Sequence, residues 1–161
     1  MLILAWVPVL AQAKGPEINL NYETFTLSNG LRVIVHEDRK APIVAISIWY
    51  HVGSRDEPAG KTGFAHLFEH LMFGGSSNIP DFDGPLQMAG GQSNAFTSND
   101  ITNYYMTLPS VNLESAFWLE SDRLNLLDFN QNSLDVQRKV VIEEFKQRYL
   151  NQPYGDVWLL L

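Results

Sequence analysis

The sequence predicts an α+β protein in which a mostly antiparallel sheet packs against helices. Two segments alternate between apolar and polar residues about a central turn, residues 24–35 and residues 92–108, and each predicts a β-hairpin. The two longest helical patterns, residues 110–127 and 133–150, follow one another at the end of the chain. Strands joined by hairpins, with helices grouped apart from them, are typical of α+β proteins.

The first hairpin is centred on Asn29-Gly30, and we expect a type I′ turn there, with positive φ at both residues. The segment from Ile43 to Val52 is rich in β-branched and aromatic residues and predicts a largely buried strand. The second hairpin has its arms at Gln92–Thr97 and Thr102–Leu108.

A helix is predicted from about Gly63 to Phe73, ended by Gly74-Gly75. Ser110 and Ser133 are the expected caps of the two longer helices. The apolar face of the first of them is expected to contain Val111, Leu113, Phe117, Leu124 and Leu127. Its acidic residues, Glu114, Glu120 and Asp122, are expected on the solvated face.

Composition limits the function. The 161 residues suffice for one domain with a core, and 45% hydrophobic and 18% charged residues are ordinary for a globular protein. A net charge of −7 argues against a nucleic-acid partner, because phosphates would be repelled. The chain has no cysteine, so any metal must be bound by His, Asp or Glu.

The N-terminus resembles a secretory signal. An apolar run from Leu2 to Leu10 is too short to span a bilayer and leads into Ala11-Gln12-Ala13, a signal-peptidase pattern, although a basic segment before it is missing. We expect residues 1–13 to be a signal peptide and the protein to be exported, periplasmic or secreted. An uncleaved apolar tail is the alternative.

The C-terminus ends in the apolar run Leu159-Leu160-Leu161. Because chain ends are usually polar and exposed, we expect residues 14–161 to be a fragment whose missing part would cover that run.

The strongest chemical signal is His66-Leu67-Phe68-Glu69-His70 on the predicted helix. His66 and His70 are one helical turn apart on one face, so their imidazoles can bind one ion, and Glu69 lies beside them. This is the inverted zincin motif H-x-x-E-H, in which a zinc ion activates water and the Glu accepts its proton. A chance occurrence on a surface helix is the alternative.

A catalytic zinc needs a third protein ligand, and Glu143 and Glu144 are the candidates on the last helix. Spacing does not decide between them. Glu144 lies on the apolar stripe with Val140 and Val141, and a buried acid needs a partner such as a metal, so we prefer Glu144.

These residues resemble those of the insulinase/pitrilysin family of zinc peptidases, and most closely its bacterial secreted branch. The similarity extends from about Tyr22 to Gly155 and includes, in order, Trp49 to Glu57, the His66–His70 motif, Asn94 to Thr97, Asn103 to Tyr105, Val140 to Glu144 and Asn151 to Gly155.

The resemblance implies a mitochondrial-processing-peptidase-like metallohydrolase fold, present here as a partial half-domain. It thereby implies that residues 14–161 are a truncated N-terminal catalytic zinc-peptidase domain. It implies one Zn²⁺ per active site, bound by His66, His70 and Glu144, with Glu69 as general base. It also implies that Asn94, Ala95 and Phe96 pair with a peptide substrate as an added strand. A helper acid of some members falls on Gln137, a departure from the pattern.

The resulting hypothesis is a zinc endopeptidase acting on peptides or small unfolded proteins. The family's second homologous half-domain, in the same chain or on a partner subunit, would complete the substrate chamber, and without it the chain's own activity is in doubt. The alternative is a non-catalytic or incomplete member that acts as a zinc-binding scaffold or partner subunit. Metal analysis would separate the two.

Overall fold

The computed structural model describes residues 20–160. The predicted signal peptide, residues 1–13, lies outside the described residues. By its internal contacts the chain divides into two units, Met1–Ala41 and Pro42–Leu161, which are described separately here.

The described part of the first unit is a β-hairpin. Strands β1 (Glu23–Thr26) and β2 (Arg32–Val35) are antiparallel, which confirms the predicted hairpin. The turn differs from the expected type I′, because Gly30 has a φ of 90° while Asn29 is not among the residues with positive φ. Gly30 N–H donates to the Leu27 carbonyl at 2.9 Å. One left-handed glycine after a tight turn is the arrangement of a longer hairpin loop.

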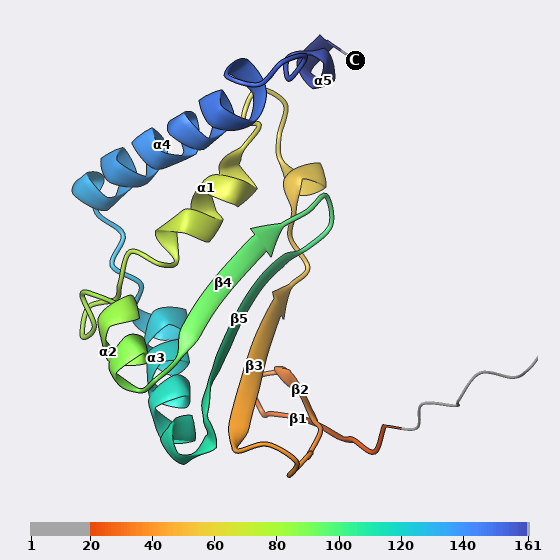
Figure 1. The fold of residues 1–161 in the computed structure, drawn as a ribbon, viewed down its shortest axis with the longest axis vertical. Coiled ribbons are helices and arrows are strands. Elements are labelled where there is room, and N and C mark those ends of the chain that lie inside the picture. Colours follow the sequence, from red (N-terminus) through yellow and green to blue (C-terminus); the bar gives the residue numbers. More distant parts are fainter. Residues whose placement is uncertain (1–19, 161) are drawn as a thin grey trace, which may run out of the picture. The chain divides into compact units, whose positions relative to one another are not determined.

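The second unit is built on a three-stranded antiparallel sheet (Figure 1). Strands β3 (Ile43–Tyr50), β4 (Gln92–Thr97) and β5 (Thr102–Pro109) lie in the order β3-β5-β4, with β5 at the centre. The largely buried strand predicted at Ile43–Val52 is wrong in its burial, since β3 alternates between exposed and half-buried residues. In this sheet β3 is an edge strand, and only one of its faces is covered.

Five α-helices and three other helical segments belong to the described part of this unit. The α-helices are α1 (Phe64–Leu71), α2 (Asp83–Met88), α3 (Leu113–Leu126), α4 (Gln131–Phe145) and α5 (Val157–Leu160). Ser54–Asp56 and Ser110–Asn112 are 3₁₀ turns, and Lys146–Leu150 is a π-type extension of α4. None of the described helices is both long and apolar enough to cross a membrane.

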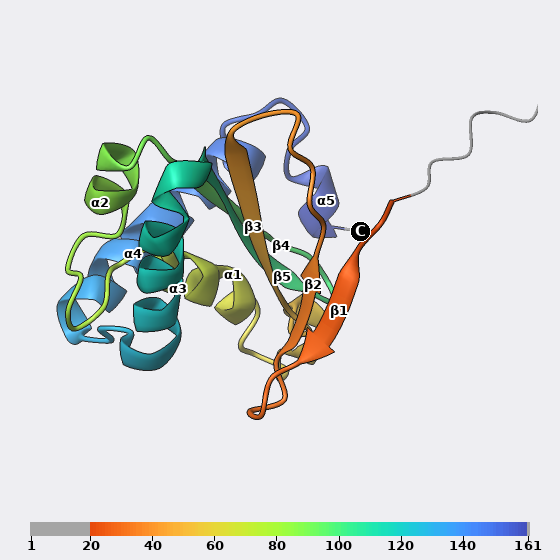
Figure 2. The ribbon, with the colours of Figure 1, turned by 90° about the horizontal axis from the view of Figure 1, so that it is seen from below.

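Helices α1, α2 and α3 lie on one face of the sheet (Figure 2). The core between them and the sheet is apolar, and its fully buried large side chains are Leu86, Met106, Leu108 and Leu119. Burial of such a side chain contributes about 1.5 to 3 kcal/mol each. The core cluster includes residues of α2, α3 and β5, and β4 is paired with β5 along its whole length. Helix α1 and strand β4 carry most of the residues singled out by the sequence.

The predicted apolar face of α3 is wrong. Phe117 is 59% exposed and Leu124 48% exposed, whereas Glu120 and Arg123 are buried beside Leu119. Asp122 is also buried, where it accepts hydrogen bonds from Ser76 and Asn78. The buried face of α3 therefore carries these paired polar groups. Hydrophobic periodicity does not detect such a face.

Helix α4 begins one turn earlier than predicted. Asn130 is the cap and accepts from Ser133 N–H at 2.9 Å, while Ser133 Oγ accepts from Asn130 N–H at 3.2 Å. Ser133 is therefore the return partner of a capping box rather than the cap itself. Likewise, Ser110 begins a 3₁₀ turn, and α3 starts at Leu113 without a side-chain cap.

Candidate metal centre

Helix α1 is anchored at its start, just before the first histidine. Gly63 has a φ of 95°, a left-handed conformation that favours glycine. The Glu57 carboxylate accepts hydrogen bonds from Gly63 N–H at 2.9 Å and from Ala65 N–H at 2.8 Å. It thereby occupies amides that a helix start leaves free, and its negative charge suits that end of the helix dipole.

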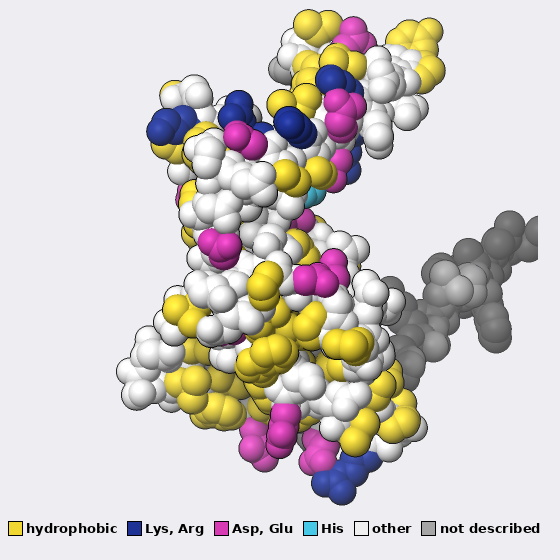
Figure 3. All heavy atoms as spheres, turned by 90° about the vertical axis from the view of Figure 1, so that its left-hand side faces the viewer, with side chains coloured by type: hydrophobic (Ala, Val, Ile, Leu, Met, Phe, Trp, Pro, Cys, Tyr) yellow, Lys and Arg dark blue, Asp and Glu magenta, His cyan; other side chains and the backbone are white. Residues whose placement is uncertain are grey.

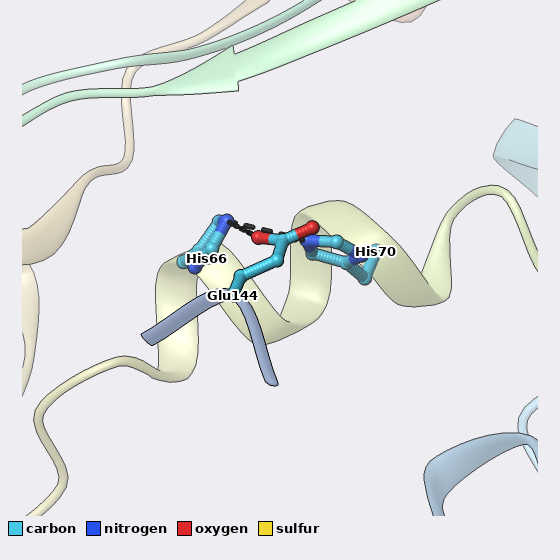
Figure 4. Close-up of side chains that lie close together, drawn as sticks. All are labelled: His66, His70 and Glu144. Atoms are coloured by element: carbon cyan, nitrogen blue, oxygen red, sulfur yellow. Dashed lines mark hydrogen bonds and ion pairs between the residues drawn. The ribbon is translucent and has the colours of Figure 1, made fainter. Parts of the chain in front are cut away.

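The structure brings together the side chains of His66, His70 and Glu144 (Figure 4). The two Nε2 atoms are 3.2 Å apart. Glu144 Oε2 lies 3.5 Å from His66 Nε2 and 3.4 Å from His70 Nε2. Glu144 reaches them from α4, which packs beside α1.

These distances fit a zinc ion. Zinc bonds of about 2.0 to 2.2 Å in tetrahedral geometry separate neighbouring ligand atoms by about 3.3 to 3.6 Å. The three measured distances, 3.2, 3.4 and 3.5 Å, fall at or beside this range. Two imidazoles and one carboxylate are also a donor set that zinc prefers, and three ligands leave a fourth position open.

The cluster is accessible from solvent. The side chains of His66, His70 and Glu144 are 40%, 19% and 48% exposed. Figure 3 shows a hollow below the segment that contains α4, with histidine atoms (cyan) at its wall. A molecule from solvent can therefore reach the cluster without opening a closed core.

Of the two adjacent acids on α4, only Glu144 faces the histidines. Glu143 forms an ion pair with Lys146, with Nζ and Oε1 2.6 Å apart. The preference for Glu144 thus agrees with the geometry, but its stated reason does not. Glu144 is half exposed, and Val140 is 39% exposed, so the stripe is not a buried one among the described residues.

Glu69 lies on α1 between the two histidines in sequence and is half-buried. One of its oxygens, Oε2, accepts a hydrogen bond from the Thr97 hydroxyl of β4. Tyr104 is close enough for the Glu69 charge to act on it. Burial, and after it the Glu69 charge, raises the pKa of the Tyr104 phenol far above its usual range, so Tyr104 stays neutral.

Strand β4, with Asn94, Ala95 and Phe96, is an edge strand of the described sheet. Ala95 N–H donates to the side chain of its own neighbour, Asn94 Oδ1, at 2.8 Å. Phe96 is 42% exposed and meets Trp49 edge to face, with ring centroids 6.1 Å apart. A free edge of this kind is where an extended peptide can add as a strand.

Gln137 lies on α4, seven residues before Glu144 and so two turns away on a similar face. Its side-chain amide has no acidic proton to give.

Sequence reasoning gave no role to Glu57 and Thr97, which bind residues of α1, and it missed the burial of the Glu120–Arg123 pair on α3. The alternation of side chains along the predicted strand could have singled out Thr97. Residues two apart in a strand share a face, so Ala95 and Thr97 point opposite to Asn94 and Phe96. No local pattern marks Glu57, because the amides that it accepts from belong to the start of another element, α1. Glu120 and Arg123 are three residues apart on α3, a spacing that permits an ion pair but does not predict its burial.

An antiparallel sheet backed by helices, with a His-His-Glu cluster at the helix beside it, defines a candidate metal-binding α+β protein. The family comparison makes this more specific. Residues 32–153 match the model of the insulinase family, peptidase family M16, and the chain belongs to that family.

Individual proteins agree with this assignment. The zinc protease PqqE of Helicobacter pylori is 37% identical over 140 residues, which are 85% of this chain and 32% of that protein. The crystal structure of a protease from Helicobacter pylori superposes with a TM-score of 0.80 at 36% identity, covering 84% of this chain and 33% of the other. Pitrilysin superposes with a TM-score of 0.73 at 26% identity, covering 84% and 15%. The chain thus spans about a third or less of the length of these proteins.

Proposed function

We propose that this chain is the zinc-binding part of an endopeptidase that hydrolyses peptides or small unfolded proteins, with zinc held by His66, His70 and Glu144. The observation that carries the proposal is the spacing of these three ligand atoms, which fits one tetrahedral ion. Membership of a peptidase family supports it, as does the name of the zinc protease to which the chain is similar.

In this proposal a zinc ion, when bound, supplies Lewis-acid polarisation and lowers the pKa of a water molecule to about 7. Glu69 accepts the proton of the water that attacks the scissile carbonyl. It then delivers that proton to the departing amine as the C–N bond breaks. The backbone of Asn94, Ala95 and Phe96 holds the peptide extended beside the cluster, once Asn94 releases Ala95 N–H.

We also propose that a second homologous half-domain, in the same chain or on a partner subunit, completes the substrate chamber. The short span of this chain relative to its relatives supports this.

Zinc binding tests the site directly. The 161-residue chain is expected to retain about one zinc per molecule after dialysis at neutral pH, measured by elemental analysis. Glu144→Gln should weaken zinc binding by more than about a hundredfold. Removal of a residue that only hydrogen-bonds to a metal ligand costs about ten- to a hundredfold, and removal of a ligand itself should cost more. Glu143→Gln is the matched control, one position away, and should bind zinc like the wild type. Equal zinc binding by the two variants would remove Glu144 from the site.

The N-terminus gives a separate prediction, because we propose that residues 1–13 direct export. Expression in a secreting bacterium should yield an exported protein whose first residue is Lys14, as determined by N-terminal sequencing. Ala13→Tyr should block cleavage, because signal peptidase requires small residues there. An exported chain that still begins at Met1 contradicts the proposed cleavage site.

A further inference from the structure

Thr97 is the last residue of β4 and connects that strand to Glu69. Its hydroxyl donates to Glu69 Oε2. Behind it, Thr97 Oγ1 lies 3.4 Å from Thr102 Oγ1, and Thr102 Oγ1 donates to the Val52 carbonyl at 3.0 Å. The three groups form a short polar row from the end of β3 to the carboxylate.

The protons in this row can be assigned. A threonine hydroxyl has one proton. Thr102 gives its proton to the Val52 carbonyl, and a carboxylate is a stronger acceptor than a second hydroxyl, so the Thr97 proton goes to Glu69. Thr97 is itself half-buried at the end of a paired strand, opposite Thr102 in the register. The Thr97 hydroxyl is therefore expected to donate to the Glu69 carboxylate.

We propose that Thr97 is a positioning residue for Glu69, an inference that rests on the proposed function. Holding Oε2 restrains a flexible side chain and leaves Oε1 free to face the attacking water. Because Thr97 lies on the same strand as Asn94, Ala95 and Phe96, one element sets both the place of the substrate backbone and the orientation of the base. A general base contributes only when it is held within hydrogen-bond reach of the proton.

The test compares three zinc-loaded variants of the full chain with the wild type. Thr97→Val keeps the shape of the side chain and removes the hydroxyl, and Thr97→Ser keeps the hydroxyl. Thr107→Val is the matched control, a half-buried threonine of the same sheet that pairs with Ala45 and Gln92. Hydrolysis of a quenched fluorescent peptide gives kcat and KM, and elemental analysis gives the zinc content.

Thr97→Val should lower kcat about tenfold or more while KM changes less than about twofold and zinc stays at one per chain. Thr97→Ser should retain kcat to within about threefold, and Thr107→Val should match the wild type. If Thr97 had a purely structural role, Thr97→Val would not lower kcat alone, and Thr97→Ser would not restore kcat. Wild-type kcat in Thr97→Val, with Glu69→Gln inactive, overturns the positioning role and leaves the proposed function intact.

A second readout needs no activity. The shifts in the urea midpoint caused by Thr97→Val, Glu69→Gln and the double variant form a double-mutant cycle. The double variant should shift the midpoint by less than the sum of the single shifts. If Glu69→Gln hydrolyses peptide at the wild-type rate, the proposed role of Glu69 as general base fails; if the wild-type chain hydrolyses none without the second half-domain, kcat offers no comparison. In either case the double-mutant cycle still tests the contact between Thr97 and Glu69: additive shifts overturn that contact, and coupled shifts support it.

Discussion

Glu69→Gln is expected to abolish peptide hydrolysis, with at least a hundredfold loss of kcat, while the chain still binds about one zinc. General acid–base catalysis by a positioned side chain contributes about 10² to 10⁴-fold, and an amide cannot accept the proton. Glu69 is not part of the His66, His70 and Glu144 cluster, so its replacement leaves the three ligand atoms in place. Initial rates with a quenched fluorescent peptide, alongside zinc content, provide the measurement.

His70→Ala is the informative comparison for this experiment, because it should lose both zinc and hydrolysis. Glu114→Gln, an exposed acid near the start of α3, should lose neither. A Glu69→Gln variant that cleaves peptide at the wild-type rate would show that Glu69 is not the base.

Glu120→Ala is expected to lower the free energy of unfolding by about 3 to 5 kcal/mol, the usual cost of removing one partner from a buried ion pair. The side chains of Arg123 and Glu120 are only 3% and 6% exposed, and Arg123 Nε donates to Glu120 Oε2 at 3.1 Å. The guanidinium also lies over aromatic rings, 4.4 Å from the centroid of Phe82 and 4.9 Å from that of Tyr104. Without Glu120 its charge would remain buried without a carboxylate partner. Urea unfolding followed by circular dichroism measures the change.

Asp135→Ala is the matched control, since Asp135 and Arg138 form a pair with the same spacing of three residues on a helix. Those side chains are 48% and 58% exposed, so the loss should stay below about 1 kcal/mol. Replacing both buried partners, as Glu120→Leu with Arg123→Met, should recover most of the stability lost by Glu120→Ala. A loss below 1 kcal/mol in Glu120→Ala would show that the pair is not buried in solution.

Local sequence determined much of the fold. The hairpins at Asn29-Gly30 and between Gln92 and Leu108 follow from alternation and turn residues within a few positions of each other. The helix at His66 follows from a short periodic segment, but it ends at Leu71, before the predicted end at Gly74-Gly75. The expected turn type at Asn29 failed, because turn geometry depends on loop length as well as on the dipeptide.

Burial was less predictable. Hydrophobic periodicity placed Phe117 and Leu124 inside and Glu120 outside, and the structure shows the reverse. A charged side chain can be buried when its partner, here Arg123 among aromatic rings, is already in place. That arrangement joins α3 to Phe82, just before α2, and to Tyr104 of β5, which no local window contains.

For the candidate site, the sequence by itself determined that His66 and His70 share one helical face, because a spacing of four residues is a property of the helix. Its spacing did not decide between Glu143 and Glu144, the preference for Glu144 rested on a burial that the structure does not show, and Thr97 had no role. Only the tertiary structure decided these points, by packing α4 against α1 so that Glu144 meets both imidazoles, and by ending β4 beside Glu69. The distances that define a metal site join residues far apart in the chain, and packing of whole elements sets such distances.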